Sequence, residues 1–264
     1  MKVVVLCGGL GTRLREESEF RPKPMVEIGG RPILWHIMKT YAHYGFREFV
    51  LCLGYRGNMI KDYFLNYEAM NNDFSICLGQ PANIRYHGHH TEQGFTVTLA
   101  ETGLNTMTGG RIRRIEKYID SDLFLLTYGD GLSDVDIRAL LEFHHSHGKI
   151  ATVTTVPPIS RFGVVKINDS GVVERFTEKP KGNGSISAGF FVLNRAVFDY
   201  LGDGDYIFER EPLERLSAEG QLMAYRHRGF FYGMDTFREY QYLNELWNSG
   251  AAPWKVWNNG ELAQ

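Results

Sequence analysis

The chain has 264 residues, of which 43% are hydrophobic and 23% are charged, a composition that excludes a disordered chain. Its 29 basic and 31 acidic residues give a formal net charge of −2, which excludes the general basic field of a nucleic-acid-binding protein. Apolar runs stay below the ~18 residues of a membrane span, and the run at residues 1–6 is too short for a signal peptide. Because the three cysteines lack CxxC spacing, we expect buried thiols in a cytoplasmic protein with no membrane or nucleic-acid partner.

Strands and helices alternate over the first 160 residues. Continuous apolar, β-branched runs predict buried strands at residues 3–7, 49–53, 123–127 and 150–156. Apolar residues at helical spacing predict helices at residues 33–41, 59–67, 111–119 and 136–147. This rhythm predicts an α/β fold: a Rossmann-like, mixed but mainly parallel sheet flanked by helices.

The alternation of strands and helices is interrupted between residues 71 and 110. This segment is polar and rich in Gly, Asn, His and Thr, although Phe95, Val97 and Leu99 alternate with threonines as in a half-exposed strand. We interpret residues 71–110 as an insertion over one edge of the sheet. Whether it is a mobile lid or a subunit contact stays open at this stage.

The pattern changes again after residue 160. Two short apolar runs, 164–167 and 172–176, flank the turn 168–171 and predict a β-hairpin. A strand at 190–193 and helices near 213–219 and 236–247 follow. With no linker between the parts, we expect one domain over residues 1–264, divided into 1–160 with its insertion and a hairpin-rich part, 161–264, that ends in helices.

A glycine-rich loop follows the first predicted strand directly. Ligands of open α/β sheets bind at this carboxyl edge, where glycines let backbone N–H groups approach an anion. Leu14 occupies the place of the last glycine in a GxGxxG dinucleotide motif that begins at Gly9, and a Gly-Lys-Ser/Thr ending is absent. We expect a phosphate-binding loop of another kind, made by Leu6, Gly8, Gly9, Leu10, Gly11, Thr12 and Arg13.

Further charged residues fall where they could reach that loop. Lys23 is held between Pro22 and Pro24, which restrict the backbone on both sides. Asp130 follows a buried strand and Gly129, so its carboxylate belongs to the same sheet edge as the loop. Asp235 precedes a predicted helix and could equally be the N-cap of that helix.

Five motifs together resemble the sugar-nucleotide pyrophosphorylase family. They are Gly8-Gly9-Leu10-Gly11-Thr12-Arg13-Leu14, Pro22-Lys23-Pro24, Gly129-Asp130-Gly131, Glu178-Lys179-Pro180 and Ala188-Gly189-Phe190. Within that family, residues 21–38, 107–111 and 162–163 resemble the cytidylyltransferase branch. The resemblance covers nearly the whole chain.

The resemblance implies a reaction: CMP passes from CTP to α-D-glucose 1-phosphate, giving CDP-glucose and pyrophosphate, by Mg²⁺-dependent in-line attack. The product would feed sugar nucleotide and surface polysaccharide synthesis, and we expect a homo-oligomer. UTP or dTTP in place of CTP, and a non-catalytic regulatory module that binds nucleotide sugars, remain as alternatives.

The resemblance also implies roles for single residues. Arg13 and Lys23 would be catalytic, and Asp130 and Asp235 would bind the metal. Glu178, Lys179 and Gly189 would bind the sugar phosphate. The nucleotide would be bound by the loop, by Lys23 and Gly129 and, as candidates for base or triphosphate contacts, by Thr106, Thr108 and Arg111.

Overall fold

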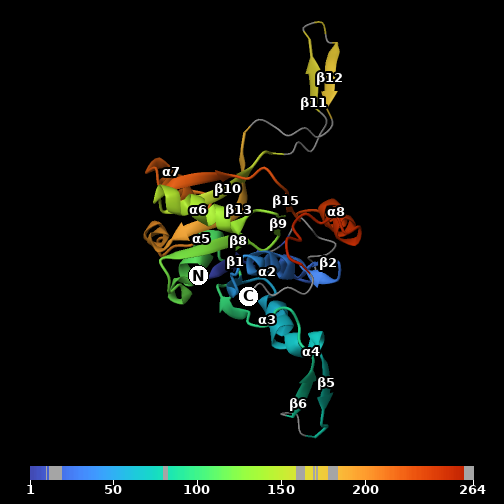
Figure 1. The fold of residues 1–264 in the computed structure, drawn as a ribbon. Coiled ribbons are helices and arrows are strands. Elements are labelled where there is room, and N and C mark those ends of the chain that lie inside the picture. Colours follow the sequence, from blue (N-terminus) through green and yellow to red (C-terminus); the bar gives the residue numbers. More distant parts are fainter. Residues whose placement is uncertain are drawn as a thin grey trace.

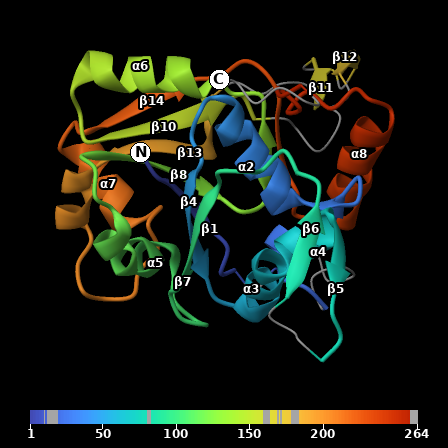
Figure 2. The same cartoon turned by 60° about the horizontal axis from the view of Figure 1, so that its bottom comes forward.

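A computed structural model describes the chain at residues 1–9, 11, 20–79, 83–158, 164–168, 170, 172–177 and 184–258. Its centre is a seven-stranded sheet with the order β14-β10-β13-β8-β1-β4-β7, flanked by helices on both faces (Figure 1, Figure 2). The strands are β1 (Val3–Leu6), β4 (Glu48–Leu53), β7 (Thr96–Glu101), β8 (Leu123–Tyr128), β10 (Ala151–Val156), β13 (Ile186–Asn194) and β14 (Leu222–Arg226). β13 runs antiparallel to β8 and β10, whereas the other pairings are parallel. The prediction of a mixed, mainly parallel sheet is confirmed.

Each face of this sheet has its own apolar core. Val3 and Val5 of β1 point into one cluster and Val4 and Leu6 into the other, because side chains alternate along a strand. The first cluster packs under α2 (Ile33–His43), α3 (Gly57–Leu65) and α6 (Ile137–His147). The second packs under α5 (Thr108–Arg114), the 3-10 helix η3 (Arg195–Tyr200) and α7 (Glu211–Ala218). β1 is therefore buried on both sides, as its continuous apolar run predicts.

Two predicted helices have different bounds. The helix expected at 59–67 is broken at Asn66, whose side-chain amide donates to the carbonyl of Asp62; α4 (Tyr67–Asn71) begins afterwards. The helix expected at 111–119 begins earlier, at Thr108, and ends at Arg114, with a 3-10 turn η2 (Glu116–Tyr118) behind it. Side chains that hydrogen-bond their own backbone set such ends, and an apolar periodicity does not record them.

The segment 71–110 divides into two unlike parts. Strands β5 (Asp73–Ile76) and β6 (Ile84–His87) form a hairpin that projects from the globule (Figure 1). The half-exposed strand predicted around Val97 is confirmed, but as β7, which pairs with β4 at the edge of the central sheet. The excursion is thus shorter than the sequence suggests.

Short two-stranded sheets and a docked tail complete the fold. The predicted hairpin is confirmed as β11 (Val164–Ile167) with β12 (Val173–Thr177). Two further short pairs are β2 (Glu27–Ile28) with β3 (Arg31–Pro32), which follow η1 (Lys23–Met25), and β9 (Gly131–Ser133) with β15 (Phe231–Gly233), which precedes α8 (Phe237–Asn248). Trp254 and Trp257 are buried in the first core cluster, so the aromatic tail is docked on the body.

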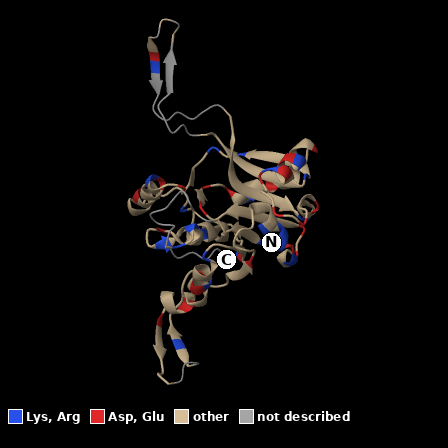
Figure 3. Ribbon diagram, turned by 180° about the vertical axis from the view of Figure 1, so that it is seen from behind, with Lys and Arg blue, Asp and Glu red and all other residues tan. Residues whose placement is uncertain are grey.

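Charged residues of both signs are interspersed over the helices and loops of the globule (Figure 3). Within the residues that the structure describes, no helix combines the length and the apolar character of a membrane span.

Candidate nucleotide and metal site

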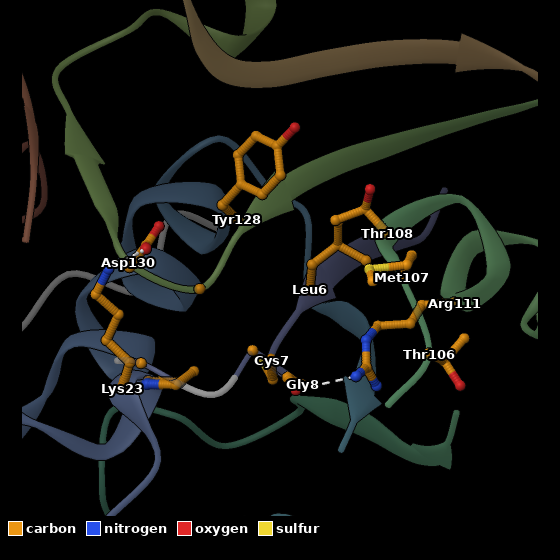
Figure 4. Close-up of a pocket in the computed structure, with 14 residues that line it drawn as sticks. Leu6, Cys7, Gly8, Lys23, Thr106, Met107, Thr108, Arg111, Tyr128 and Asp130 are labelled. Atoms are coloured by element: carbon orange, nitrogen blue, oxygen red, sulfur yellow. Dashed lines mark hydrogen bonds and ion pairs between the residues drawn. The ribbon is translucent and has the colours of Figure 1, made fainter. Parts of the chain in front are cut away.

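A cavity of about 320 Å³ opens where β1 and β8 end (Figure 4). These neighbouring parallel strands deliver their following loops to the same sheet edge, where ligands of such folds bind. The structure brings together there all the described residues of the predicted nucleotide site: Leu6, Gly8, Gly9, Gly11, Lys23, Thr106, Thr108, Arg111 and Gly129, with Asp130 beside them. Leu10, Thr12 and Arg13, which belong to the same prediction, lie outside the described residues.

Four other residues line the cavity but were not predicted as site residues: Cys7, Pro24, Met107 and Tyr128. Each directly adjoins a predicted site residue, so adjacency is the signal that could have found them. Cys7 is fully buried, and burial raises the pKa of its thiol well above the ordinary value. It is therefore part of the wall rather than a nucleophile.

Arg111 fixes the glycine loop in place. Its guanidinium is buried and donates to the carbonyl oxygen of Gly8 at 2.9 Å. The same group donates to the carbonyl of Leu53 at 2.9 Å and to the hydroxyl of Thr102 at 2.8 Å, and reaches the carbonyls of Gly103 and Leu104. A Cβ on Gly8 would lie 2.1 Å from a guanidinium nitrogen, so glycine is required there by close packing. A direct contact between Arg111 and a nucleotide stays a prediction, and the bonds in this structure are to the protein.

Thr106 and Thr108 also have partners within the protein. The hydroxyl of Thr108 donates to Glu209 at 2.6 Å and accepts from the backbone N–H of Phe208 at 2.8 Å. The hydroxyl of Thr106 accepts from Arg114 at 2.9 Å. Both threonines thereby hold the cavity wall at the start of α5, and their contact with a nucleotide remains a prediction.

Asp130 and Asp235 meet through the pairing of β9 with β15. Gly131 pairs with Gly233, and the backbone N–H of Met234 donates to the carbonyl of Asp130 at 2.9 Å. This small sheet brings two carboxylates together that lie more than a hundred residues apart in the chain.

Asp235 does not cap the helix that follows it. Thr236 is the N-cap of α8 and forms a capping box with Glu239. The side chain of Glu239 also accepts from the backbone N–H of Asp235, at 2.7 Å. The N-cap alternative for Asp235 is therefore wrong, and its carboxylate points to the site instead.

The ammonium group of Lys23 lies between the two carboxylates. Its Nζ donates to Asp130 at 2.7 Å and to Asp235 at 2.6 Å, and the Lys23 side chain is only 11% exposed. Burial acts to lower the pKa of Lys23, but the two carboxylates outweigh it and the pKa is raised. Because both carboxylates converge on one cation and remain partly exposed, the donor set fits a divalent ion that keeps several water ligands.

Gly189 lies next to the cavity, in β13. Its φ is +75° at a break in the register with β10, and a Cβ there would lie 2.1 Å from the ring of Tyr128. The Tyr128 hydroxyl donates to Glu209, and burial followed by the Glu209 charge raises the pKa of Tyr128. The ring thus separates Gly189 from the nucleotide cavity. Glu178 and Lys179, predicted on the same sugar side, lie outside the described residues.

Comparison with known proteins agrees with this geometry. The chain is 50% identical over 260 residues to glucose-1-phosphate cytidylyltransferase from Salmonella typhimurium, covering 97% of this chain and 100% of that protein. It is 45% identical over 266 residues to probable glucose-1-phosphate cytidylyltransferase from Bacillus subtilis, with the same coverage. Among solved structures, HddC from Yersinia pseudotuberculosis superposes with a TM-score of 0.67 at 26% identity, over 93% of this chain and 99% of that one. The profile of the nucleotidyl transferase family matches residues 2–236, and the chain belongs to that family.

Proposed function

We propose that this protein transfers CMP from CTP to α-D-glucose 1-phosphate, forming CDP-glucose and releasing pyrophosphate. The structural observation that carries the proposal is the cluster of Lys23, Asp130 and Asp235 beside the glycine loop. The choice of CTP and glucose 1-phosphate is supported by the two cytidylyltransferases that this chain matches over their whole length.

The acidic and basic residues of the site would have different roles. Asp130 and Asp235 would hold Mg²⁺, which when bound neutralises charge on the triphosphate and on the departing pyrophosphate. The backbone N–H groups of the glycine loop, with Arg13 and Lys23, would stabilise the negative charge of the phosphates. Glu178, Lys179 and Gly189 would bind the sugar phosphate.

The nucleophile comes from the substrate. A phosphate oxygen of glucose 1-phosphate attacks the α-phosphorus of CTP, a new P–O bond forms, and the bond to the β-phosphate breaks as pyrophosphate leaves. The second pKa of a phosphomonoester is about 6, so this oxygen is already deprotonated at neutral pH. The site therefore needs charge stabilisation and alignment and no general base.

We also expect a homo-oligomer. The β5–β6 hairpin carries Phe74, Ile76, Ile84 and Tyr86 on one face, each at least 40% exposed in the single chain. An apolar face of this kind is unusual on a monomer and typical of a subunit contact. Light scattering of the purified protein after size exclusion would give the molar mass; a single chain would contradict the expectation.

Pyrophosphate release tests the reaction. Glucose 1-phosphate is supplied with each of CTP, UTP, dTTP and GTP, and the Asp130→Asn variant is the control for contaminating activity. The proposal expects CTP to give the highest kcat/KM. A higher value with UTP or dTTP would change the nucleotide, and binding without pyrophosphate release from any NTP would favour the regulatory module.

A further inference from the structure

The contacts of Lys23 conflict with a metal at the same carboxylates. Asp130 Oδ2 lies 2.7 Å from the Lys23 ammonium (Figure 4), and Asp235 Oδ1 lies 2.6 Å from the same nitrogen. Mg²⁺ binds carboxylate oxygens at about 2.0–2.1 Å, so a metal shared by these two oxygens would occupy nearly the position of that nitrogen. A divalent and a monovalent cation so close together repel strongly at partly buried positions.

The ammonium group also has a reason to be where it is. Without it, the two carboxylates that share this partner atom would face each other as like charges, which disfavours keeping both ionised at this distance. Lys23 halves that charge and satisfies one oxygen of each aspartate. It thus holds Asp130 and Asp235 in the arrangement that a metal requires.

Lys23 can reach a second set of partners. Pro22 and Pro24 restrict its backbone, but a lysine side chain has four flexible carbons. Lys23 lines the same cavity as Gly8, Gly9 and Gly11 of the glycine loop. Phosphate oxygens bound at that loop would offer the ammonium group anionic partners in place of the carboxylates.

We propose that Lys23 is an exchangeable counter-ion: it neutralises Asp130 and Asp235 before the metal arrives, and the metal displaces it towards the phosphates. This rests on the proposed function, through the metal site. A metal binding alone must break two ion pairs, whereas a metal binding with a triphosphate gives the ammonium group new partners. Metal and nucleotide therefore strengthen each other's binding, and Lys23 is the residue that couples them.

Metal binding to the nucleotide-free protein tests the first half. Mn²⁺ is titrated into the full chain and free Mn²⁺ is measured by electron paramagnetic resonance. Lys23→Met should bind Mn²⁺ more tightly by about tenfold, the equivalent of one ion pair of ~1.4 kcal/mol. Lys23→Arg and Lys39→Met should match the wild type, because the former keeps the charge and Lys39 pairs with Glu92 outside the cavity. Unchanged or weaker binding by Lys23→Met would overturn the proposal.

A footprint on the wild-type protein avoids any folding defect of the variants. Acetylation of Lys23 by an N-hydroxysuccinimide ester is followed by mass spectrometry, with Lys39 as internal reference. Mg²⁺ alone should raise the labelling rate of Lys23 severalfold, and Mg²⁺ with a CTP analogue whose α,β-bridge is methylene should lower it again. A rate that Mg²⁺ leaves unchanged or reduces would contradict displacement.

The double variant Asp130→Asn/Asp235→Asn separates this proposal from the proposed function. If it still binds Mn²⁺ as the wild type does, the metal site itself is wrong. If it loses Mn²⁺ while Lys23→Met binds with wild-type affinity, the metal site stands and the exchange of Lys23 is wrong.

Discussion

Arg111 provides the sharpest test of how the glycine loop is held. Its guanidinium donates to five acceptors on segments that come together only in the folded chain, among them Gly8 and Leu53. Arg111→Lys keeps the charge but replaces a planar fork by a compact ammonium that cannot span the same acceptors. We expect this conservative change to loosen the loop.

The size of the effect follows from the hydrogen bonds that the guanidinium makes. At least two of them would be lost, and a hydrogen bond to a charged group contributes about 1.5–3 kcal/mol; the Gly8 and Leu53 carbonyls each keep another donor, from Tyr55 and Thr102. We therefore expect Arg111→Lys to lower the free energy of unfolding by about 3–6 kcal/mol, or the melting temperature by roughly 10–20 °C for a chain of this length. The KM for CTP should rise in parallel, because the Gly8 carbonyl is no longer fixed.

Urea unfolding monitored by tryptophan fluorescence, combined with steady-state kinetics, measures both effects. Arg113→Lys is the matched control: it lies on the same helix but is paired with Glu116 and is about one-third exposed. If Arg111→Lys unfolds at the wild-type urea concentration while its KM for CTP rises, the nucleotide is the main partner of the guanidinium. The reasoning from lost hydrogen bonds would then be refuted.

Three further outcomes are expected. Asp235→Asn should keep the melting temperature within a few degrees yet lower kcat by orders of magnitude, since Thr236 and not Asp235 caps α8; unchanged turnover at saturating Mg²⁺ would remove it from the metal site. Gly129→Ala should raise the KM for CTP and destabilise the fold by about 1–3 kcal/mol, because the new Cβ would lie 2.8 Å from Pro24, next to Lys23. A wild-type KM and a wild-type free energy of unfolding would mean that Pro24 moves aside at no cost. Burial lowers the pKa of His36 to about 4, so the unfolded chain binds the proton more readily than the folded chain. The free energy of unfolding should therefore fall as the pH drops from 6.5 towards 4, by about 2 kcal/mol at pH 5. A His36→Asn variant measured by urea unfolding should lack this part of the drop, whereas His87→Asn should retain it.

The parts of the site that follow strands could be predicted from the sequence. Gly8 and Asp130 each come just after a continuous apolar run, and the carboxyl ends of parallel neighbours necessarily share an edge. The position of Asp235 could not be derived in the same way. It depends on β15, three half-buried residues whose pairing with β9 leaves no periodic signal.

The partners of Arg111 could not be predicted from the sequence either, because most of them are backbone carbonyls, which every residue possesses. Its contacts with Gly8 and Leu53 span 103 and 58 residues of chain. The edge strand β14 was missed for another reason: all five of its residues are partly buried or exposed, so it lacks the continuous apolar run of a buried strand. Pattern reasoning finds elements buried on a whole face, and it fails where single long-range contacts decide the conformation.

The short sheet that joins Gly131 to Gly233 also bears on the order in which the protein folds. During synthesis the glycine loop, Lys23 and Asp130 leave the ribosome long before Asp235 does. Contacts over such a sequence separation close slowly, because a long loop must first be ordered. A nascent chain that ends before β15 would therefore contain all seven strands of the central sheet, but only Asp130 of the two carboxylates that pair with Lys23. The paired carboxylates are then among the last features to assemble, so the chain gains its metal affinity only when synthesis is nearly finished.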